Sequence, residues 1–135
     1  MAEAFLSLAV ADRLDVLGIA ADRLGRPAHL LEKDVWVVWA LQVLFESAVK
    51  DDLVFKGGTS LSKAYGVIDR FSEDVDLTYD IRALVPDLVE ARGDAIPATT
   101  SEERRWSRRV REVLPLWVAG TIQPIITKAI ALQGL

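Results

Sequence analysis

Residues 53–80 read LVFKGGTSLSKAYGVIDRFSEDVDLTYD, and the spacing of their apolar side chains changes twice. The stretch begins with Leu53, Val54 and Phe55, an apolar run typical of a short buried strand, which two glycines end. The next apolar residues recur at the spacing of one helix face: Leu61, Ala64, Tyr65 and Ile68. From residue 74 to residue 80 the pattern alternates. It predicts a second strand with an acidic face and a buried face made by Val75, Leu77 and Tyr79.

The glycine turn and the helix start after it form a candidate phosphate site. Gly57 and Gly58 have no Cβ, so a ligand can approach their backbone closely. Thr59 or Ser60 can cap the helix, whose free N–H groups and dipole favour an anion. Lys63 falls in the first turn, where the dipole disfavours a cation unless an anion is also present. A strand-to-helix turn with a solvated lysine is the alternative.

Asp74 and Asp76 are the second half of the candidate site. Alternate residues of a strand point to the same side, about 6.6 Å apart along the chain. Two carboxylates placed so repel each other unless a cation neutralises them. Mg²⁺ suits this role because it takes oxygen ligands and bridges carboxylates to phosphates, and Mn²⁺ is an alternative. The pair therefore predicts metal-dependent phosphoryl or nucleotidyl transfer, with a solvated acidic strand as the other interpretation.

The composition limits the remaining classes of protein. With 135 residues, 51% of them hydrophobic and 27% charged, the chain is expected to form one soluble globular domain over residues 1–135. The lack of cysteine excludes disulfides and thiolate catalysis, and the single histidine, His29, is expected in a loop. No signal-peptide pattern opens the chain and no apolar run approaches about 18 residues. We therefore expect a cytoplasmic protein without membrane contact.

The segments before residue 53 are predicted to be helical. Residues 4–24 have helical spacing, and Gly25 and Pro27 mark the end of this helix. Residues 32–45 are predicted to form a second, largely buried helix with Glu32 and Asp34 in its first turn. A turn at residues 50–52 then leads into the first strand.

The segments after residue 80 are also predicted to be mainly helical. A short helix is expected over residues 84–92, with Pro86 in its first turn, and a loop over residues 93–100. Ser101 is the candidate N-cap of a long helix, with Glu102 and Glu103 in its first turn. This helix has apolar residues on one side and five arginines on the other: Arg104, Arg105, Arg108, Arg109 and Arg111. The arginines suit RNA phosphates, or simply form a solvated helix face. A kink or break is expected near each internal proline, Pro115 and Pro124.

Two blocks together resemble the AbiEii/AbiGii family of nucleotidyltransferase toxins, in the polymerase-beta-like nucleotidyltransferase superfamily. They are Phe-Lys-Gly-Gly-Thr-Ser-Leu-Ser-Lys at 55–63 and Arg-Phe-Ser-Glu-Asp-Val-Asp-Leu at 70–77. Glu-Lys-Asp-x-Trp at 32–36 is similar to an N-terminal helix of the family, so the resemblance covers about residues 30–80. It implies an α/β (α+β) nucleotidyltransferase-like domain, with a small mixed sheet of strands near 53–56 and 74–79 packed by helices.

The resemblance also implies a function. The protein would be a toxin of a toxin–antitoxin or abortive-infection (phage defence) system, with a cognate antitoxin as partner. It would use Mg²⁺ and a nucleoside triphosphate to transfer a nucleotide to an acceptor such as tRNA. By position, the triphosphate would be held by Gly57, Gly58, Thr59 and Ser60, and the metal by Asp74 and Asp76. Lys63 joins the site on the dipole argument alone.

The chain departs from the superfamily pattern in one respect. The superfamily has a third carboxylate on a later strand, and here Asp87, Glu90 and Asp94 are poorly placed for that role. We therefore expect a domain incomplete at its C-terminus, weak or inactive as a transferase, which self-associates as a homo-oligomer to cover its sheet edge. Two alternatives remain: a catalytically degenerate module that binds a nucleotide or a partner, and a helical self-association protein acting through residues 101–134.

Overall fold

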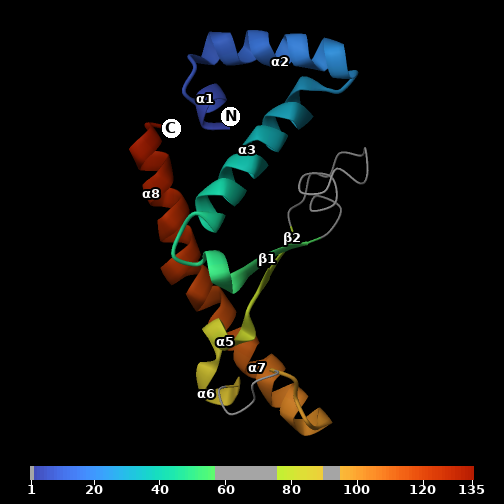
Figure 1. Cartoon of the computed structure of the whole chain (residues 1–135), viewed down its shortest axis with the longest axis vertical. Helices are drawn as coiled ribbons and strands as arrows, with labels where there is room; N and C mark the ends of the chain where they lie inside the picture. Colours follow the sequence, from blue (N-terminus) through green and yellow to red (C-terminus); the bar gives the residue numbers. More distant parts are fainter. Residues whose placement is uncertain (1, 57–75, 90–94) are drawn as a thin grey trace.

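The computed structural model describes residues 2–56, 76–89 and 95–135, which form a mainly helical chain with one small sheet (Figure 1). The N-terminal part contains α1 (Ala2–Leu6), α2 (Val10–Leu24), α3 (Ala28–Phe45) and the 3-10 turn η1 (Lys50–Asp52). The sheet contains β1 (Leu53–Lys56) and β2 (Asp76–Tyr79). The C-terminal part contains α5 (Ile81–Leu84), α6 (Pro86–Val89), α7 (Thr100–Trp117), the π segment η3 (Val118–Ile122) and α8 (Gln123–Gln133).

The two strands form an antiparallel pair in which Leu53 lies opposite Tyr79 and Lys56 opposite Asp76. The predicted strands near 53–56 and 74–79 are thus confirmed within the described residues, while Asp74 and Val75 lie outside them. The described sheet is antiparallel and not mixed. The α+β class holds, and its helices outweigh its strands.

One face of this pair packs against helices, as the alternating pattern predicts. Leu53 is buried, but Leu77 and Tyr79 are only half-buried, so the prediction that both are buried was wrong. The reason is an apolar hollow of about 260 Å³ between the sheet and the C-terminal helices, which both side chains line. The Tyr79 ring lies 6.5 Å from that of Trp117 across this hollow.

The prediction of a single helix over residues 4–24 was wrong, because residues 7–9 are not helical and separate α1 from α2. Ala9 is extended, with φ −60° and ψ 152°, and the Ser7 hydroxyl donates to the Ala4 carbonyl over 2.8 Å. The break lets Leu6 pack into a core with Trp39, whereas Val10 on α2 is 64% exposed. In one straight helix, the apolar residues of α1 and α2 would have to pack against the core through the same helix face.

The helix α3 begins earlier and is less buried than predicted. Its N-cap is Pro27, so Glu32 and Asp34 lie beyond the first turn, and His29 is an exposed helical residue instead of a loop residue. Only Trp39 and Leu44 are buried on this helix, because the described helices α1, α2 and α8 contact it from some sides only. The C′ position of Gly25 is confirmed, with φ 62° and its N–H donating to the Ala21 carbonyl.

The predicted helix over residues 84–92 is two one-turn helices as far as the structure describes it. Pro86 is the first residue of α6, as predicted, and Val85 before it is non-helical. A proline disfavours helical backbone at the preceding residue, which explains why α5 ends at Leu84. Asp80 starts α5 by accepting a hydrogen bond of 2.9 Å from the Arg82 N–H.

The C-terminal helices run on continuously from Thr100 to Gln133 as a 34-residue rod (Figure 1). The predicted N-cap Ser101 was wrong: Thr99 caps the helix, and its side chain accepts from the Glu102 N–H over 3.1 Å. The Glu102 carboxylate returns to the Ala98 N–H over 2.8 Å, so the two side chains close the helix end reciprocally, as in a capping box.

Neither proline breaks the rod, although both were expected to kink or interrupt it. The helix instead contains a π segment between the two prolines, in which the Gln123 N–H donates to the Val118 carbonyl five residues back. Pro124 has no N–H to offer the Gly120 carbonyl, and a wider turn accommodates the missing bond without ending the helix.

The same rod bears on the expectation that no apolar segment of the chain is long enough to cross a membrane. By length and composition alone, Thr100–Gln133 is apolar enough to cross a membrane, and none of its apolar window is buried against the rest of the described chain. The sequence expectation that no stretch approaches this property was therefore wrong. A single helix of this kind does not establish a location for the protein.

The core is divided among three clusters that all touch this rod. The first joins α5 and α6 to α7 and contains Leu84, Val85, Val89 and Trp106. The second joins α1, α3 and α8, and the third joins α3, β1 and the middle of the rod. The termini consequently lie close together at one end of the rod (Figure 1).

Candidate functional site

Asp76 is the predicted site residue that the structure describes. It is the first residue of β2 and is exposed, on the strand face that also presents Thr78 and the 56%-exposed Val54. The opposite face carries Leu53 and Tyr79 toward the helices. The predicted outward orientation of Asp76 is therefore confirmed, and its carboxylate is accessible to a ligand.

The remaining predicted site residues lie outside the described part of the chain. They are Gly57, Gly58, Thr59, Ser60, Lys63 and Asp74. The phosphate cradle and the paired carboxylates therefore stay predictions. The described strand ends that adjoin the two motifs, Lys56 and Asp76, are register partners and so lie side by side.

The third carboxylate was not predicted from the sequence, and the structure identifies none among the described residues. Within residues 2–56, 76–89 and 95–135, no three histidine, aspartate or glutamate side chains are close enough to hold a metal ion. Asp87 is exposed on α6, and Glu90 and Asp94 lie outside the described ranges. The donor that Asp76 does offer, a hard carboxylate oxygen open to solvent, is of the kind that Mg²⁺ prefers.

Asp80 directly follows β2, and its carboxylate has a structural role as the N-cap of α5. Its carboxylate accepts from the Arg82 N–H and forms an ion pair of 3.4 Å with the Arg82 guanidinium. It therefore fixes the start of α5, and it offers a natural control for charge changes at Asp76.

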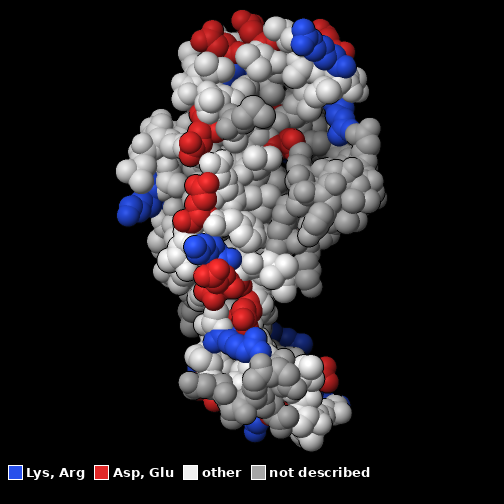
Figure 2. Space-filling model, viewed as in Figure 1, with Lys and Arg blue, Asp and Glu red and all other residues white. Residues whose placement is uncertain are grey.

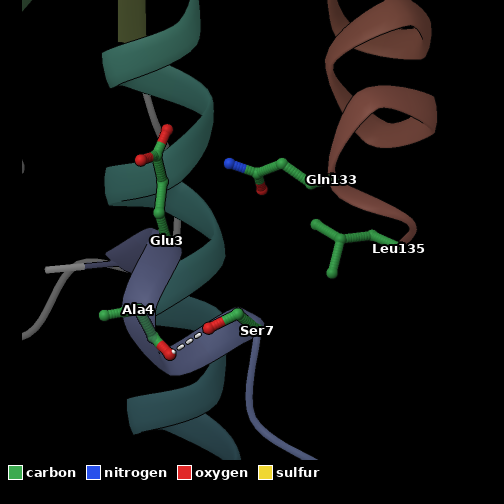
Figure 3. A pocket seen from close by; sticks show the side chains of 5 residues that line it. All are labelled: Glu3, Ala4, Ser7, Gln133 and Leu135. Carbon is green, nitrogen blue, oxygen red and sulfur yellow. Dashed lines mark hydrogen bonds between the residues drawn. The ribbon is translucent and has the colours of Figure 1, made fainter.

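A hollow of about 440 Å³ lies where the two termini meet, lined by Glu3, Ala4, Ser7, Gln133 and Leu135 (Figure 3). Two of its polar side chains are already used for structure. The Ser7 hydroxyl donates to the Ala4 carbonyl, and the Gln133 carboxamide oxygen accepts from Trp39. These two bonds help to hold the ends of the fold together around the hollow.

Charges of both signs are found at each end of the molecule. Figure 2 shows acidic and basic side chains over α2 at one end and again at the opposite end, where α5, α6 and α7 lie. At that second end, two adjoining hollows lie along α7, one beside the buried Trp106 and one lined by arginines. The sequence predicted the arginine face but not the hollow beside Trp106, because that hollow depends on contacts among α5, residues 95–97 and α7.

Comparison with known proteins identifies the family. The chain matches the family model of the nucleotidyl transferase AbiEii toxin of a type IV toxin–antitoxin system over residues 39–131. No curated protein and no solved structure matches it. The match begins in α3, includes both strands and extends through most of the C-terminal rod. It therefore reaches further than the resemblance seen over residues 30–80, although residues 32–36 lie outside it. A match over this share of the chain places the protein in the AbiEii family of nucleotidyl transferase toxins from type IV toxin–antitoxin systems.

Proposed function

We propose that the chain is a Mg²⁺-dependent nucleotidyltransferase toxin that transfers a nucleotide from a nucleoside triphosphate to an acceptor such as tRNA. Membership of the AbiEii family supports transferase chemistry, a nucleotide substrate and an antitoxin partner. The observation on this chain that carries the proposal is Asp76, an exposed carboxylate at the start of a strand, beside the end of the strand that leads to Gly57 and Gly58.

Each part of the site has a distinct role in this proposal. Asp74 and Asp76 would hold the metal, and Mn²⁺ could replace Mg²⁺ on the same oxygen donors. The bound metal would neutralise charge on the triphosphate and orient the reacting phosphoryl group. Gly57, Gly58, Thr59 and Ser60 would bind the triphosphate through backbone N–H groups and hydroxyls, and Lys63 would add a cation.

Asp76 is able to bind a metal without disturbing the fold. Its side chain is on the solvent face of β2, whereas Leu53 and Tyr79 fill the opposite face. Substitution at Asp76 should therefore change binding and leave the packing of the hairpin intact. This separation makes a clean test possible.

The test compares Asp76→Asn with Asp80→Asn, which lose the same charge from the same segment. Calorimetric titration of the protein with a nucleoside triphosphate, with and without Mg²⁺, gives the metal-dependent affinity. Asp76→Asn should weaken it by about 2 kcal/mol, roughly 30-fold, the scale of a lost hydrogen bond to a charged group. Asp80→Asn should keep the affinity of the parent protein, because asparagine also caps a helix. Equal affinities for Asp76→Asn and the parent would place the metal elsewhere.

Transfer is tested separately from binding. Incubation with labelled triphosphates and bulk tRNA should give label on the RNA that depends on Asp74 and Asp76. We expect slow labelling from this 135-residue chain, for the lack of an identified third carboxylate. Rapid labelling would show that the third group lies within these residues. Nucleotide binding with no transfer under any condition would favour the degenerate binding module instead.

A further inference from the structure

Two adjoining hollows on α7 differ in chemistry. The first, of about 320 Å³, lies between the end of β2, α5, residues 95–97 and α7. Its walls are largely apolar and include Tyr79, Ile81, Pro97 and Val110. The second, of about 440 Å³, runs along one face of α7 and is lined by Thr100 and three arginines. Glu103 and Ser107 line both hollows and so form the border between them.

Trp106, in the wall of the first hollow, carries an unsatisfied hydrogen-bond donor. This residue lines the hollow and is only 3% exposed, and its indole nitrogen is buried with no hydrogen-bond partner. Buried donors are nearly always paired, since an unpaired one loses its bonds to water and gains none. The contrast with Trp39 is direct, because that indole N–H is paired to Gln133. A ligand in the hollow would lie against the wall that Trp106 forms, and a small shift of this side chain would let its indole N–H reach the acceptor that the chain lacks.

The second hollow presents Arg104, Arg108 and Arg111, spaced at i, i+4 and i+7 on α7. All three are exposed, and none forms an ion pair within the described part of the chain. Their neighbour Arg109 differs, because it pairs with Glu112 at 3.4 Å. Guanidinium groups match the geometry and charge of phosphate oxygens, so a row of uncommitted arginines suits a phosphate or a chain of phosphates.

We propose that the two hollows together form a second nucleotide-binding site, distinct from the one at Asp76. The heterocyclic base would enter the apolar hollow and accept a hydrogen bond from Trp106, while the phosphate would lie on the arginine row. The Glu103 carboxylate would repel a phosphate. At the border between the hollows it could instead accept a hydrogen bond from an amino group on the edge of the base. An apolar slot with a buried donor next to a cationic surface fits a nucleotide better than it fits a free phosphate or an apolar molecule.

This site is separate from the proposed catalytic one. Asp76 is at the other end of β2 from Tyr79 and on the opposite strand face. The proposal therefore stands even if Asp76 binds no metal. The ligand is either a free mononucleotide or one nucleotide of an RNA strand, which share the same base and phosphate chemistry.

The test uses fluorescence anisotropy and calorimetry on the full chain in EDTA, which removes any contribution from a metal at Asp76. The probes are the four nucleoside monophosphates, a labelled single-stranded RNA octamer and inorganic phosphate. Arg108→Gln is compared with Arg109→Gln, which removes the same charge from the same helix but from an arginine already paired to Glu112. Arg108→Gln should weaken nucleotide or RNA binding about tenfold, and Arg109→Gln should change it less than twofold.

Trp106→Phe tests the base half of the site. Phenylalanine keeps a ring in the core but removes the indole N–H, so base-containing probes should bind about 5- to 10-fold more weakly. If Trp106 had only a structural role, Trp106→Phe would lower the stability of the protein without selectively weakening the binding of base-containing probes. Urea unfolding is therefore measured on the same variant. Should Trp106→Phe not fold, the pair of arginine variants still decides the proposal.

The outcomes separate the two sources of the ligand. Monophosphates that bind as tightly as the octamer indicate a free nucleotide. An octamer that binds more tightly, with a salt slope lowered by about 0.7 in Arg108→Gln, indicates an RNA strand. Either result supports the site, and Asp76→Asn should leave it unchanged. Inorganic phosphate binding as well as the nucleotides, with no effect of Trp106→Phe, would overturn it, as would the absence of binding.

Discussion

The indole N–H of Trp39 donates to the carboxamide oxygen of Gln133 over 2.7 Å, joining residues 94 positions apart in the chain. Trp39 is 2% exposed and packs in one cluster with Ala2 and Leu6. The bond therefore satisfies a buried donor and fixes the end of α8 against α3 and α1. It is a long-range contact that closes the fold where the two termini meet.

We predict that Gln133→Leu destabilises the protein by about 1–3 kcal/mol. The substitution keeps the side chain's approximate size but leaves the Trp39 N–H buried and unpaired, which carries the full desolvation cost. Urea unfolding followed by far-UV circular dichroism measures the change. Gln42→Leu is the control, because Gln42 forms only an exposed bond of 3.3 Å with Glu46 and should shift stability by less than about 0.5 kcal/mol. Equal effects of the two variants would show that the Trp39 bond contributes nothing.

The cap of α7 gives a second prediction. Thr99→Ala removes the side chain that accepts from the Glu102 N–H and should cost about 1 kcal/mol. Ser101→Ala alters the neighbouring hydroxyl that the sequence favoured as the cap, yet its effect should stay within about 0.5 kcal/mol, because Ser101 lies inside the helix and is exposed. A larger loss for Ser101→Ala than for Thr99→Ala would mean that the helix begins two residues later in solution.

Two glycines should respond to alanine with opposite signs. Gly25 has φ 62°, a left-handed backbone in which a Cβ is strained, so Gly25→Ala should destabilise by about 1 kcal/mol. Gly18 lies inside α2 with open space around the position of a Cβ, so Gly18→Ala should stabilise by about 0.5–1 kcal/mol. Thermal unfolding of both variants checks the pair. Two shifts of the same sign would contradict the assigned end of α2.

Local sequence patterns predicted the parts of the fold that local physics decides. The alternation around Asp76 gave a strand and its solvent face, and Gly25 gave a helix end, because each depends on a few neighbouring residues. Longer-range features were not accessible. The break at Ala9 depends on Leu6 entering a core formed by α3 and α8, and the depth at which Leu77 and Tyr79 are buried depends on a hollow formed with the distant α7 and η3.

The same limit applied to the sites. Asp76 could be proposed as a site residue because paired acids on a predicted strand suggest metal binding from the sequence alone. The unpaired donor of Trp106 was not, since a tryptophan in an apolar helix stripe predicts core packing and says nothing about hydrogen bonding. The cap at Thr99 was missed for a related reason: Thr99 and Ser101 are both good caps, and the return bond from Glu102 to Ala98 decides between them.

The exposed side of the C-terminal rod gives the last prediction. Leu116 and Leu132 are 72% and 77% exposed, whereas Leu84 is 6% exposed within the cluster around Trp106. Leu84→Ala should cost about 2–5 kcal/mol, because it removes buried methyl groups and leaves a cavity. Leu116→Gln and Leu132→Gln remove no buried contact within the described chain and should each change its unfolding free energy by less than about 0.5 kcal/mol.

Sedimentation velocity on the same variants tests the expected homo-oligomer. If copies of the chain associate through this side of the rod, the variant that combines Leu116→Gln and Leu132→Gln should sediment as a monomer at concentrations where the parent chain is an oligomer. A parent chain that is monomeric at all concentrations would contradict the expected self-association, and a large loss of stability in either single leucine variant would show that its side chain is covered within the monomer.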